Sequence, residues 1–320
     1  MTVIVTGGTG FIGAEVVRIL LDKGEKRPFV FDINPSTKLL DNLADQVELV
    51  RGDLGNLSHI LDVVKQARPS VIYHLGGMLS VPSDADPAAA MRANALGTFH
   101  VLEAARLFDV PEVLFSSTGL TYGLDIREEI IDDFTLQRPQ LFYGVTKVFA
   151  EHMGLFYRRK YGVDFRAVRY PSIVGPGVKT PGVVQYTSWV IEECAKGNSF
   201  TVRVKPETRC PVLYYKDAAR AIVMLGEAPR NNIQMVNYVL AGVAPIASAG
   251  ELADIVTARL PDADITFEPD FELQHVLDQV IRPIDDRKAR IEWGWKPRYD
   301  QERIVDDFLQ ELMLNPQRYA

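Results

Sequence analysis

Tyr143 and Lys147 form the only Tyr-x-x-x-Lys sequence in the chain, and this spacing places both side chains on one face of a helix. An ammonium group beside a phenol lowers the pKa of the phenol from about 10 towards neutral pH. Tyr143 can then act as a general base that removes the proton from an alcohol. A segment rich in serine and threonine, residues 116–123, supplies a hydroxyl that orients the alcohol oxygen. By itself, such a pair is nearly as typical of an ordinary surface helix.

A glycine-rich loop is the second chemical signal. The sequence TGGTGFIG at 6–13 lies between a β-branched run at 2–6 and a helical pattern at 11–23. Glycines at this spacing allow a tight turn, the approach of a pyrophosphate and close contact between helix and sheet. The free N–H groups of the helix then bind the phosphates. A tight turn without a ligand is the alternative, but we predict a dinucleotide-binding loop made by Gly7, Thr9, Gly10, Phe11, Ile12 and Gly13.

Acidic and small residues at later strand ends extend this predicted site. Asp32 ends the expected strand at 28–32, where a carboxylate hydrogen-bonds the adenosine ribose and repels a 2′-phosphate. No arginine or lysine follows before Lys38, so we expect NAD rather than NADP; a turn cap is the alternative role of Asp32. We expect His74 to be a buried core histidine. The other predicted cofactor-binding residues are Asp53, Leu54, Leu75, Gly76, Gly77, Asn94, Tyr143, Lys147 and Tyr170.

The elements that position these residues alternate between apolar strands and amphipathic helices. This alternation is typical of an α/β fold with a doubly wound parallel sheet (Rossmann), followed by a smaller C-terminal α/β substrate-binding lobe. We predict an NAD-binding domain at 1–171, with returning elements around 215–240, and a lobe over most of 172–320. Expected strands are 2–6, 28–32, 47–50, 70–74, 111–116, 164–170, 200–204, 235–240 and 264–268, and expected helices are 11–23, 57–67, 87–108, 141–160, 184–196, 215–226 and 248–259.

Composition narrows the function classes. The chain has 320 residues and a net charge of −7, which argues against broad binding to nucleic acid or to an anionic membrane. No apolar run approaches the length of a membrane span, and the opening strand leaves no room for a signal peptide. The two cysteines, Cys194 and Cys210, lack a CxxC spacing and nearby histidines, which argues against a disulfide framework and a structural zinc site. We expect a cytoplasmic protein without a metal.

Taken together, these motifs resemble the extended short-chain dehydrogenase/reductase family, which is also called the NAD-dependent epimerase/dehydratase family. The resemblance covers the whole chain and rests on the glycine loop, HLGG at 74–77, SSTGLTYG at 116–123, YGVTK at 143–147 and VRYPSIVGP at 168–176. It implies that Thr118 supplies the catalytic hydroxyl beside Tyr143 and Lys147. Nucleotide-sugar epimerases of the family carry an asparagine where this chain has Ser172, which weakens the epimerase reading.

The second half is similar to L-threonine 3-dehydrogenases of the short-chain type, through segments at 78–80, 169–171, 211–218, 267–270, 283–286 and 293–295. This similarity implies that the secondary alcohol of a small β-hydroxy amino acid is oxidised, with NAD as the acceptor. The chain departs at 181–186, where Val183, Val184 and Gln185 replace two hydroxyls and an aspartate of those enzymes. Loss of a buried hydrogen-bond partner costs about 1–3 kcal/mol, so we expect an altered pocket. The predicted substrate-binding residues are Ser80, Thr118, Tyr143, Ser172, Val184 and Gln185.

Three features outside these motifs carry expectations of their own. Arg282 either receives a carboxylate or phosphate or, as we prefer, forms a surface pair with Asp285 or Asp286. The acidic run at 125–133 is expected to be a solvated loop. The tryptophans in the WGW sequence at 293–295 are expected to pack within the C-terminal lobe.

Three functions follow, of which an NAD-dependent dehydrogenase acting on a small polar molecule is preferred. An epimerase or dehydratase acting on a nucleotide sugar would hold NAD tightly and release no net NADH. A cofactor-sensing protein without catalysis is the third, because a fold does not fix a function. The resemblance also implies a homodimer, in which the helices expected at 87–108 and 141–160 pair across the interface as a four-helix bundle.

Overall fold

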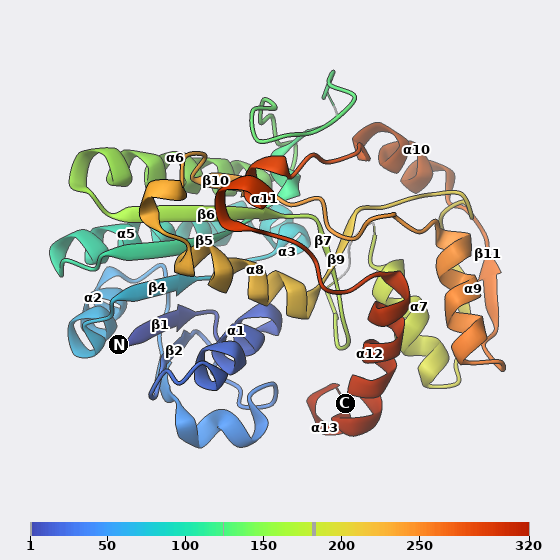
Figure 1. Cartoon of the computed structure of the whole chain (residues 1–320), viewed down its shortest axis with the longest axis horizontal. Coiled ribbons are helices and arrows are strands. Elements are labelled where there is room, and N and C mark those ends of the chain that lie inside the picture. Colours follow the sequence, from blue (N-terminus) through green and yellow to red (C-terminus); the bar gives the residue numbers. More distant parts are fainter. Residues whose placement is uncertain (1, 124, 181–183, 320) are drawn as a thin grey trace.

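The computed structural model describes residues 2–123, 125–180 and 184–319, and its centre is a seven-stranded parallel sheet (Figure 1). The strand order is β10-β6-β5-β4-β1-β2-β3. From β1 the chain builds the sheet first towards β3 and then, from β4, towards the opposite edge, so the order reverses between β1 and β4. This arrangement confirms the doubly wound α/β fold that the alternating pattern predicts. The strands are β1 (Val3–Thr6), β2 (Phe29–Asp32), β3 (Glu48–Arg51), β4 (Val71–His74), β5 (Glu112–Thr118), β6 (Asp164–Tyr170) and β10 (Asn237–Val239).

Helices cover both faces of this sheet. Consecutive residues of a strand point to opposite faces, and on β6 Arg169 bonds to Glu151 of α6 whereas Tyr170 bonds to Ala218 of α8. The helices α6 and α8 therefore lie on opposite faces, α1 packing with α8 and α5 with α6. The helices that flank the main sheet are α1 (Phe11–Asp22), α2 (Leu57–Ala67), α5 (Gly97–Leu107), α6 (Phe142–Tyr161) and α8 (Tyr215–Glu227).

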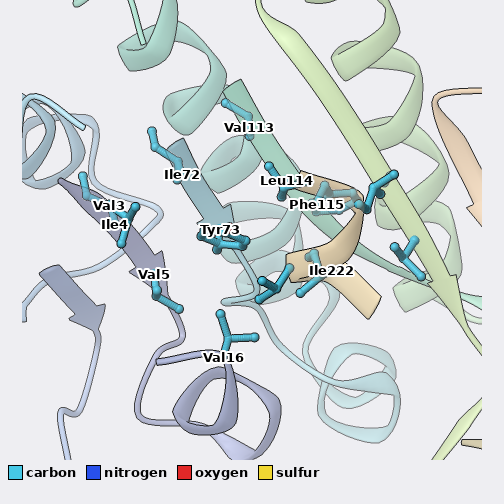
Figure 2. Packing of buried hydrophobic residues seen from close by; sticks show 14 of the residues in the cluster. Val3, Ile4, Val5, Val16, Ile72, Tyr73, Val113, Leu114, Phe115 and Ile222 are labelled. Carbon is cyan, nitrogen blue, oxygen red and sulfur yellow. The ribbon is translucent and has the colours of Figure 1, made fainter. Parts of the chain in front are cut away.

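The core between sheet and helices is made of the apolar residues of the central strands (Figure 2). Val5, Ile72 and Leu114 come from three neighbouring strands, and Val16 of α1 and Ile222 of α8 pack against them. Strands covered on both faces are mostly apolar along their length, which explains why the sequence shows continuous rather than alternating hydrophobic runs. The buried strand β6 is an exception, because its Asp164, Arg166 and Arg169 are held in ion pairs.

The C-terminal lobe has its own hydrophobic cluster and two small parallel sheets, which pair β7 with β9 and β8 with β11. In Figure 1 this lobe lies beyond the carboxyl ends of the main strands. None of the helices in the described residues is both long enough and apolar enough to cross a membrane. The lobe contains β7 (Ser172–Val174), α7 (Tyr186–Ala195), β8 (Phe200–Val202), β9 (Val212–Tyr214), α9 (Ala249–Arg259), β11 (Ile265–Phe267), α10 (Phe271–Val280), α12 (Gln301–Leu314) and α13 (Pro316–Tyr319).

The helix expected at 87–108 is interrupted. It begins as α4 (Pro87–Ala90), continues as a π-helical segment, η2 (Met91–Leu96), and ends as α5. Asp86 caps α4 by accepting a hydrogen bond from the N–H of Ala89. A π-helical turn is rare and often marks a functional position. The other short elements are α3 (Ser80–Ala85), η1 (Asp41–Gln46), η3 (Gly119–Thr121), η4 (Arg230–Asn232) and α11 (Arg287–Trp293).

Two expectations about packing are wrong. Trp293 and Trp295 belong to the cluster of the main sheet rather than to that of the lobe. The ring of Trp293 lies 5.7 Å from that of Tyr238 on β10, so α11 closes the edge where this strand joins the sheet. The acidic run is not wholly solvated either, because the carboxylate of the buried Asp133 accepts a hydrogen bond from the N–H of Val239 (2.6 Å).

Candidate active site

The predicted site residues follow the carboxyl ends of strands that are neighbours in the sheet. β4 pairs with both β1 and β5, and β5 pairs with β6, all in parallel. The glycine loop after β1, residues 75–77 after β4 and residues 116–118 at the end of β5 therefore meet at one edge. Ligands of open α/β sheets bind at such an edge, where the strand order reverses.

The glycine loop is shaped by close contact between backbones. Gly7 has a φ of +66°, and a Cβ there would lie 2.7 Å from the Cα of Gly76. At Gly13 a Cβ would lie 2.1 Å from the carbonyl oxygen of Gly7. The helix α1 begins at Phe11 after Gly10, and no side chain caps its first turn. Its N–H groups are therefore available to phosphate oxygens, so the loop fits the pyrophosphate of a dinucleotide.

Asp32 bonds to this loop. Its carboxylate accepts hydrogen bonds from the hydroxyl of Thr9 (2.7 Å) and from the N–H of Thr9 (3.3 Å). The carboxylate is only partly buried and keeps further acceptor capacity for ribose hydroxyls. The structure also brings Arg51 to this site, a residue that the sequence did not suggest. Arg51 lies on β3, is exposed, and is the register partner of Asp32.

We expect replacement of Asp32 by alanine to weaken NAD binding about tenfold, through loss of about 1.4 kcal/mol of ribose hydrogen bonding. NADP binding should improve, because the repelling carboxylate is gone and Arg51 can pair with a 2′-phosphate. Fluorescence titrations with NADH and NADPH measure both affinities. In an Asp32→Ala/Arg51→Ala double variant the gain for NADPH should disappear. An unchanged ratio of the two affinities in Asp32→Ala would contradict this role of Asp32.

His74 is the buried core histidine that the sequence predicts. Its two ring nitrogens hydrogen-bond to the hydroxyls of Thr6 (2.7 Å) and Thr98 (3.0 Å). Burial, together with the nearby charge of Lys147, lowers the pKa of His74 to about 3, so the ring is neutral. Asp53 is exposed, and its carboxylate accepts a hydrogen bond from the N–H of Gly55 (2.8 Å), which orders the turn after β3.

Asn94 lies in the π-helical segment and fixes the loop after β4. Its side-chain amide donates to the carbonyl of Met78 (3.1 Å) and to the hydroxyl of Thr146 on α6 (3.2 Å), while its oxygen accepts from the N–H of Met78 (2.7 Å). A Cβ at Gly77 would lie 2.8 Å from that oxygen. Asn94 therefore joins the glycines after β4 to the helix that carries Tyr143.

Tyr143 and Lys147 lie on one face of α6, beside the end of β5. The ammonium of Lys147 donates to the carbonyl of Ser116 (2.7 Å) and lies 5.5 Å from the centre of the Tyr143 ring. Burial lowers the pKa of Lys147 to about 8 and raises the pKa of Tyr143. The direction for Tyr143 is opposite to our expectation, because in this structure the ammonium bonds to Ser116 and desolvation of the phenol dominates.

Thr118 ends β5 and is half-buried. Its hydroxyl oxygen accepts a hydrogen bond from the N–H of Leu120 (3.2 Å), which leaves its own proton free to be donated. Thr118 therefore places a donor hydroxyl at the end of β5, two residues after Ser116, whose carbonyl binds Lys147. The three predicted catalytic residues thus come from β5 and from the first half of α6.

The predicted substrate-binding residues lie on several elements. Ser80 begins α3, which packs against α6, and Asp84 of α3 accepts from the N–H of Phe142 (2.8 Å), the first residue of α6. Ser172 begins β7 and is half-buried. Val184 and Gln185 directly precede α7, Val184 packing against the lobe cluster. The predicted change at Val183 lies outside the described residues.

Tyr170 and Arg282 have other partners in the structure. The hydroxyl of the buried Tyr170 donates to the carbonyl of Ala218 (2.8 Å), so that hydroxyl proton is not available to a cofactor. Arg282 forms no surface pair, because Asp285 bonds to Arg287 and Asp286 to Arg290. The guanidinium of Arg282 instead donates to the carbonyl oxygens of Asp278 (3.4 Å) and Ile281 (2.8 Å).

Sequence reasoning missed a buried ion pair beside these residues. Glu151, one turn after Lys147 on α6, has a side chain that is 0% exposed and accepts three hydrogen bonds from Arg169 (2.7–3.1 Å). Ser117 on β5 also donates to this carboxylate. The spacing of Tyr143, Lys147 and Glu151 on one helix face was the available signal. No group of His, Cys, Asp and Glu side chains placed to hold a metal occurs in the described part of the chain.

The family model of the NAD dependent epimerase/dehydratase family matches residues 3–241. The chain belongs to this family. It is 29% identical over 309 residues to the mitochondrial L-threonine 3-dehydrogenase of Bos taurus, which covers 96% of this chain and 81% of the relative. The cofactor of the family is NAD, and the glycine loop with Asp32 fits it.

Solved structures of the family share the fold. The holo form of an L-threonine dehydrogenase from Cupriavidus necator superposes with a TM-score of 0.87 at 26% identity and covers 98% of this chain and 100% of that one. A UDP-glucose 4-epimerase from Thermus thermophilus, in complex with NAD, gives a TM-score of 0.80 at 26% identity and covers 97% and 99%. Two activities are therefore represented among the neighbours, and the chain itself is an NAD-dependent enzyme.

Proposed function

We propose that this enzyme oxidises the secondary alcohol of a small polar substrate, as an L-threonine 3-dehydrogenase does, with NAD as the acceptor. What supports this most strongly is that Lys147 lies beside Tyr143 and bonds to the carbonyl of Ser116 on β5, the strand that ends at Thr118 and that neighbours β4 and β1 in the sheet. A donor hydroxyl, a phenol and an ammonium are the groups that such an oxidation requires.

In this proposal Thr118 donates a hydrogen bond to the substrate oxygen and holds it near the phenol of Tyr143. Tyr143 accepts the alcohol proton as a phenolate, and the positive charges of Lys147 and of a bound nicotinamide ring would oppose the desolvation that raises the pKa of this phenol. Bound NAD would supply the acceptor for the hydride that leaves the alcohol carbon. The glycine loop holds the pyrophosphate, Asp32 binds the adenosine ribose and Lys147 binds the second ribose. Asn94 keeps the loop after β4 in register with α6.

The two residues before α7 lead to a proposal about substrate specificity. Val184 and Gln185 stand just before α7, where the sequence similarity leads us to expect a hydroxyl and an aspartate. An apolar and an amide side chain there favour a less polar substrate than threonine, or one that is recognised elsewhere. NADH formation should be measured with L-threonine, L-serine, other 3-hydroxy acids and UDP-glucose. Turnover of an alcohol in this panel supports the proposal, and rapid turnover of threonine would show that the two changes are tolerated.

An epimerase or dehydratase acting on a nucleotide sugar is the second candidate. It is favoured by the family itself and by the likeness to the Thermus enzyme. Such an enzyme would keep NAD bound through purification and would release no NADH. Failure of every alcohol in the panel, together with bound NAD in the purified protein, would exclude the dehydrogenase in favour of this candidate.

We also propose that two copies associate through α5 and α6. These helices pack against each other, and their outer faces carry apolar side chains that are more than a third exposed: Phe99, Leu107, Val145, Phe149 and Phe156. Val145, Phe149 and Phe156 follow one another at helical spacing, as a seam does. A second copy matches this pair of helices with its own pair and makes the four-helix bundle that the family resemblance implies.

Replacement of Phe149 by aspartate should convert the dimer into a monomer, because a charge would be buried at the centre of the seam. Sedimentation velocity at micromolar concentration measures the mass. Ile291→Asp is the matched control, since Ile291 is equally apolar and 77% exposed but lies on α11. The control should remain a dimer. A wild-type protein that is monomeric at these concentrations would contradict the proposed interface.

A further inference from the structure

The carboxylate of Glu151 is the meeting point of four elements. It accepts hydrogen bonds from Arg169 on β6, from Ser117 on β5, from Asn237 on β10 (3.3 Å) and from Gln137 in the loop before α6 (3.1 Å). The side chains of Glu151 and Arg169 are 0% and 6% exposed. A fully buried carboxylate is costly unless it is paired, and structural stability alone is served equally well by apolar residues at such a place. Stability alone therefore does not explain why a charged residue occupies this buried position.

Lys147 provides that explanation. Glu151 follows it by one helical turn, and consecutive residues of β5 bind the two side chains, Ser116 through its carbonyl and Ser117 through its hydroxyl. The other groups that face the ammonium are the neutral His74 on β4, the Phe115 ring (4.6 Å) and the phenol of Tyr143. Burial favours the uncharged amine, and the charge of Glu151 opposes this effect.

We propose that Glu151 is a positioning residue of the active site, which keeps Lys147 in its ammonium form and fixes the end of β5 that carries Thr118. This inference rests on the proposed oxidation and adds a residue to it. Arg169 on β6 forms the ion pair with the carboxylate of Glu151, and its Nη1 donates to the hydroxyl of Tyr122 (3.0 Å). The pair thereby also holds the loop that follows Thr118.

The test compares Glu151→Gln, Glu151→Asp and a Glu151→Gln/Arg169→Gln double variant. The amide removes the charge but keeps most of the shape, the aspartate keeps the charge, and the double variant leaves no unpaired buried ion. Protein labelled with 13C at lysine Cε is titrated by NMR without ligand, and Lys147→Arg assigns the signal. We expect the pKa of Lys147 to be highest in the wild type and in Glu151→Asp, lower in the double variant and lowest in Glu151→Gln, with a total fall of about one pH unit or more.

A second readout is the pH profile of kcat for whichever alcohol is oxidised. In Glu151→Gln the alkaline limb should move to lower pH by about the same amount, whereas Glu151→Asp should lower kcat without moving the limb. Glu292→Gln is the matched control, because Glu292 is also buried but bonds to Tyr238 and to the backbone at 234 and 235. It should change stability and leave the limb in place.

The outcomes separate this inference from the proposed function. An equal pKa of Lys147 in the wild type and Glu151→Gln would overturn the inference, whatever reaction the enzyme catalyses, because the titration uses no substrate. Ordered pKa values in a protein that oxidises no alcohol would leave Glu151 as the residue that sets the charge of Lys147 and would refute the proposed oxidation alone.

Discussion

Tyr143→Phe is expected to lower kcat for alcohol oxidation by about 10²–10⁴-fold, the usual contribution of a general base. The variant loses only the hydroxyl oxygen, and the helix α6 that carries it is held by many other contacts. The affinity for NAD should therefore stay as it is in the wild type. Initial rates of NADH formation and a fluorescence titration with NADH measure the two quantities on the same preparation.

Tyr157→Phe is the matched control for this variant. Tyr157 lies on the same helix and is buried, but its hydroxyl donates to Glu103 of α5 (2.8 Å), away from the end of β5. Its loss should cost about 1 kcal/mol of stability and leave kcat near the wild-type value. Comparable activity of Tyr143→Phe and wild type would show that another group accepts the proton, and the proposed mechanism would fail.

Gly13→Ala is expected to weaken NAD binding by about two orders of magnitude or more, equivalent to about 3 kcal/mol. The added methyl would lie 2.1 Å from the carbonyl oxygen of Gly7 and 2.8 Å from the Cα of Gly8. Both are backbone atoms, so the loop itself must move away from α1 and from the pyrophosphate. Titration with NADH measures the affinity, and the temperature of thermal unfolding should fall as well.

Gly250→Ala controls for a methyl group added elsewhere. Gly250 lies in the first turn of α9 in the other lobe, where the nearest atom to the new methyl would be the carbonyl oxygen of Pro206 at 3.3 Å. NAD binding should not change in this variant. Equal affinities of Gly13→Ala and wild type would mean that the loop does not contact the cofactor.

Local patterns were enough to predict the main sheet and its order of elements. The six strands from β1 to β6 overlap the expected ranges, because each is a short apolar run bounded by polar or glycine residues. The strands β7 and β9 were missed, since each has three residues and its pairing partner lies about forty residues away. Periodicity also cannot detect a π-helical turn, which is why 87–108 was expected as one helix.

The candidate site shows the same boundary between local and distant information. Tyr143, Lys147 and Thr118 are readable from motifs. The role of Glu151 depends on its ion pair with Arg169, and residue spacing in the sequence does not show that these two side chains are in contact. Trp295 illustrates the point for packing, because it lies far along the chain from the sheet that buries it. The roles of the individual site residues and the dimer stay predictions that the variants above test, and the cytoplasmic location also stays a prediction.

The late arrival of β10 has a consequence for synthesis on the ribosome. All seven residues of β6 are buried, yet β10, which pairs with its outer edge, is made some seventy residues later. A nascent or truncated chain that ends near residue 171 therefore exposes the edge of a strand that is wholly buried in the full protein, with unpaired N–H and C=O groups, the kind of edge that recruits other chains. The first 171 residues are thus expected to aggregate when expressed alone, although they contain the glycine loop, Thr118, Tyr143 and Lys147. The sheet that carries the candidate cofactor site is therefore completed only by β10, which lies at its edge beyond β6.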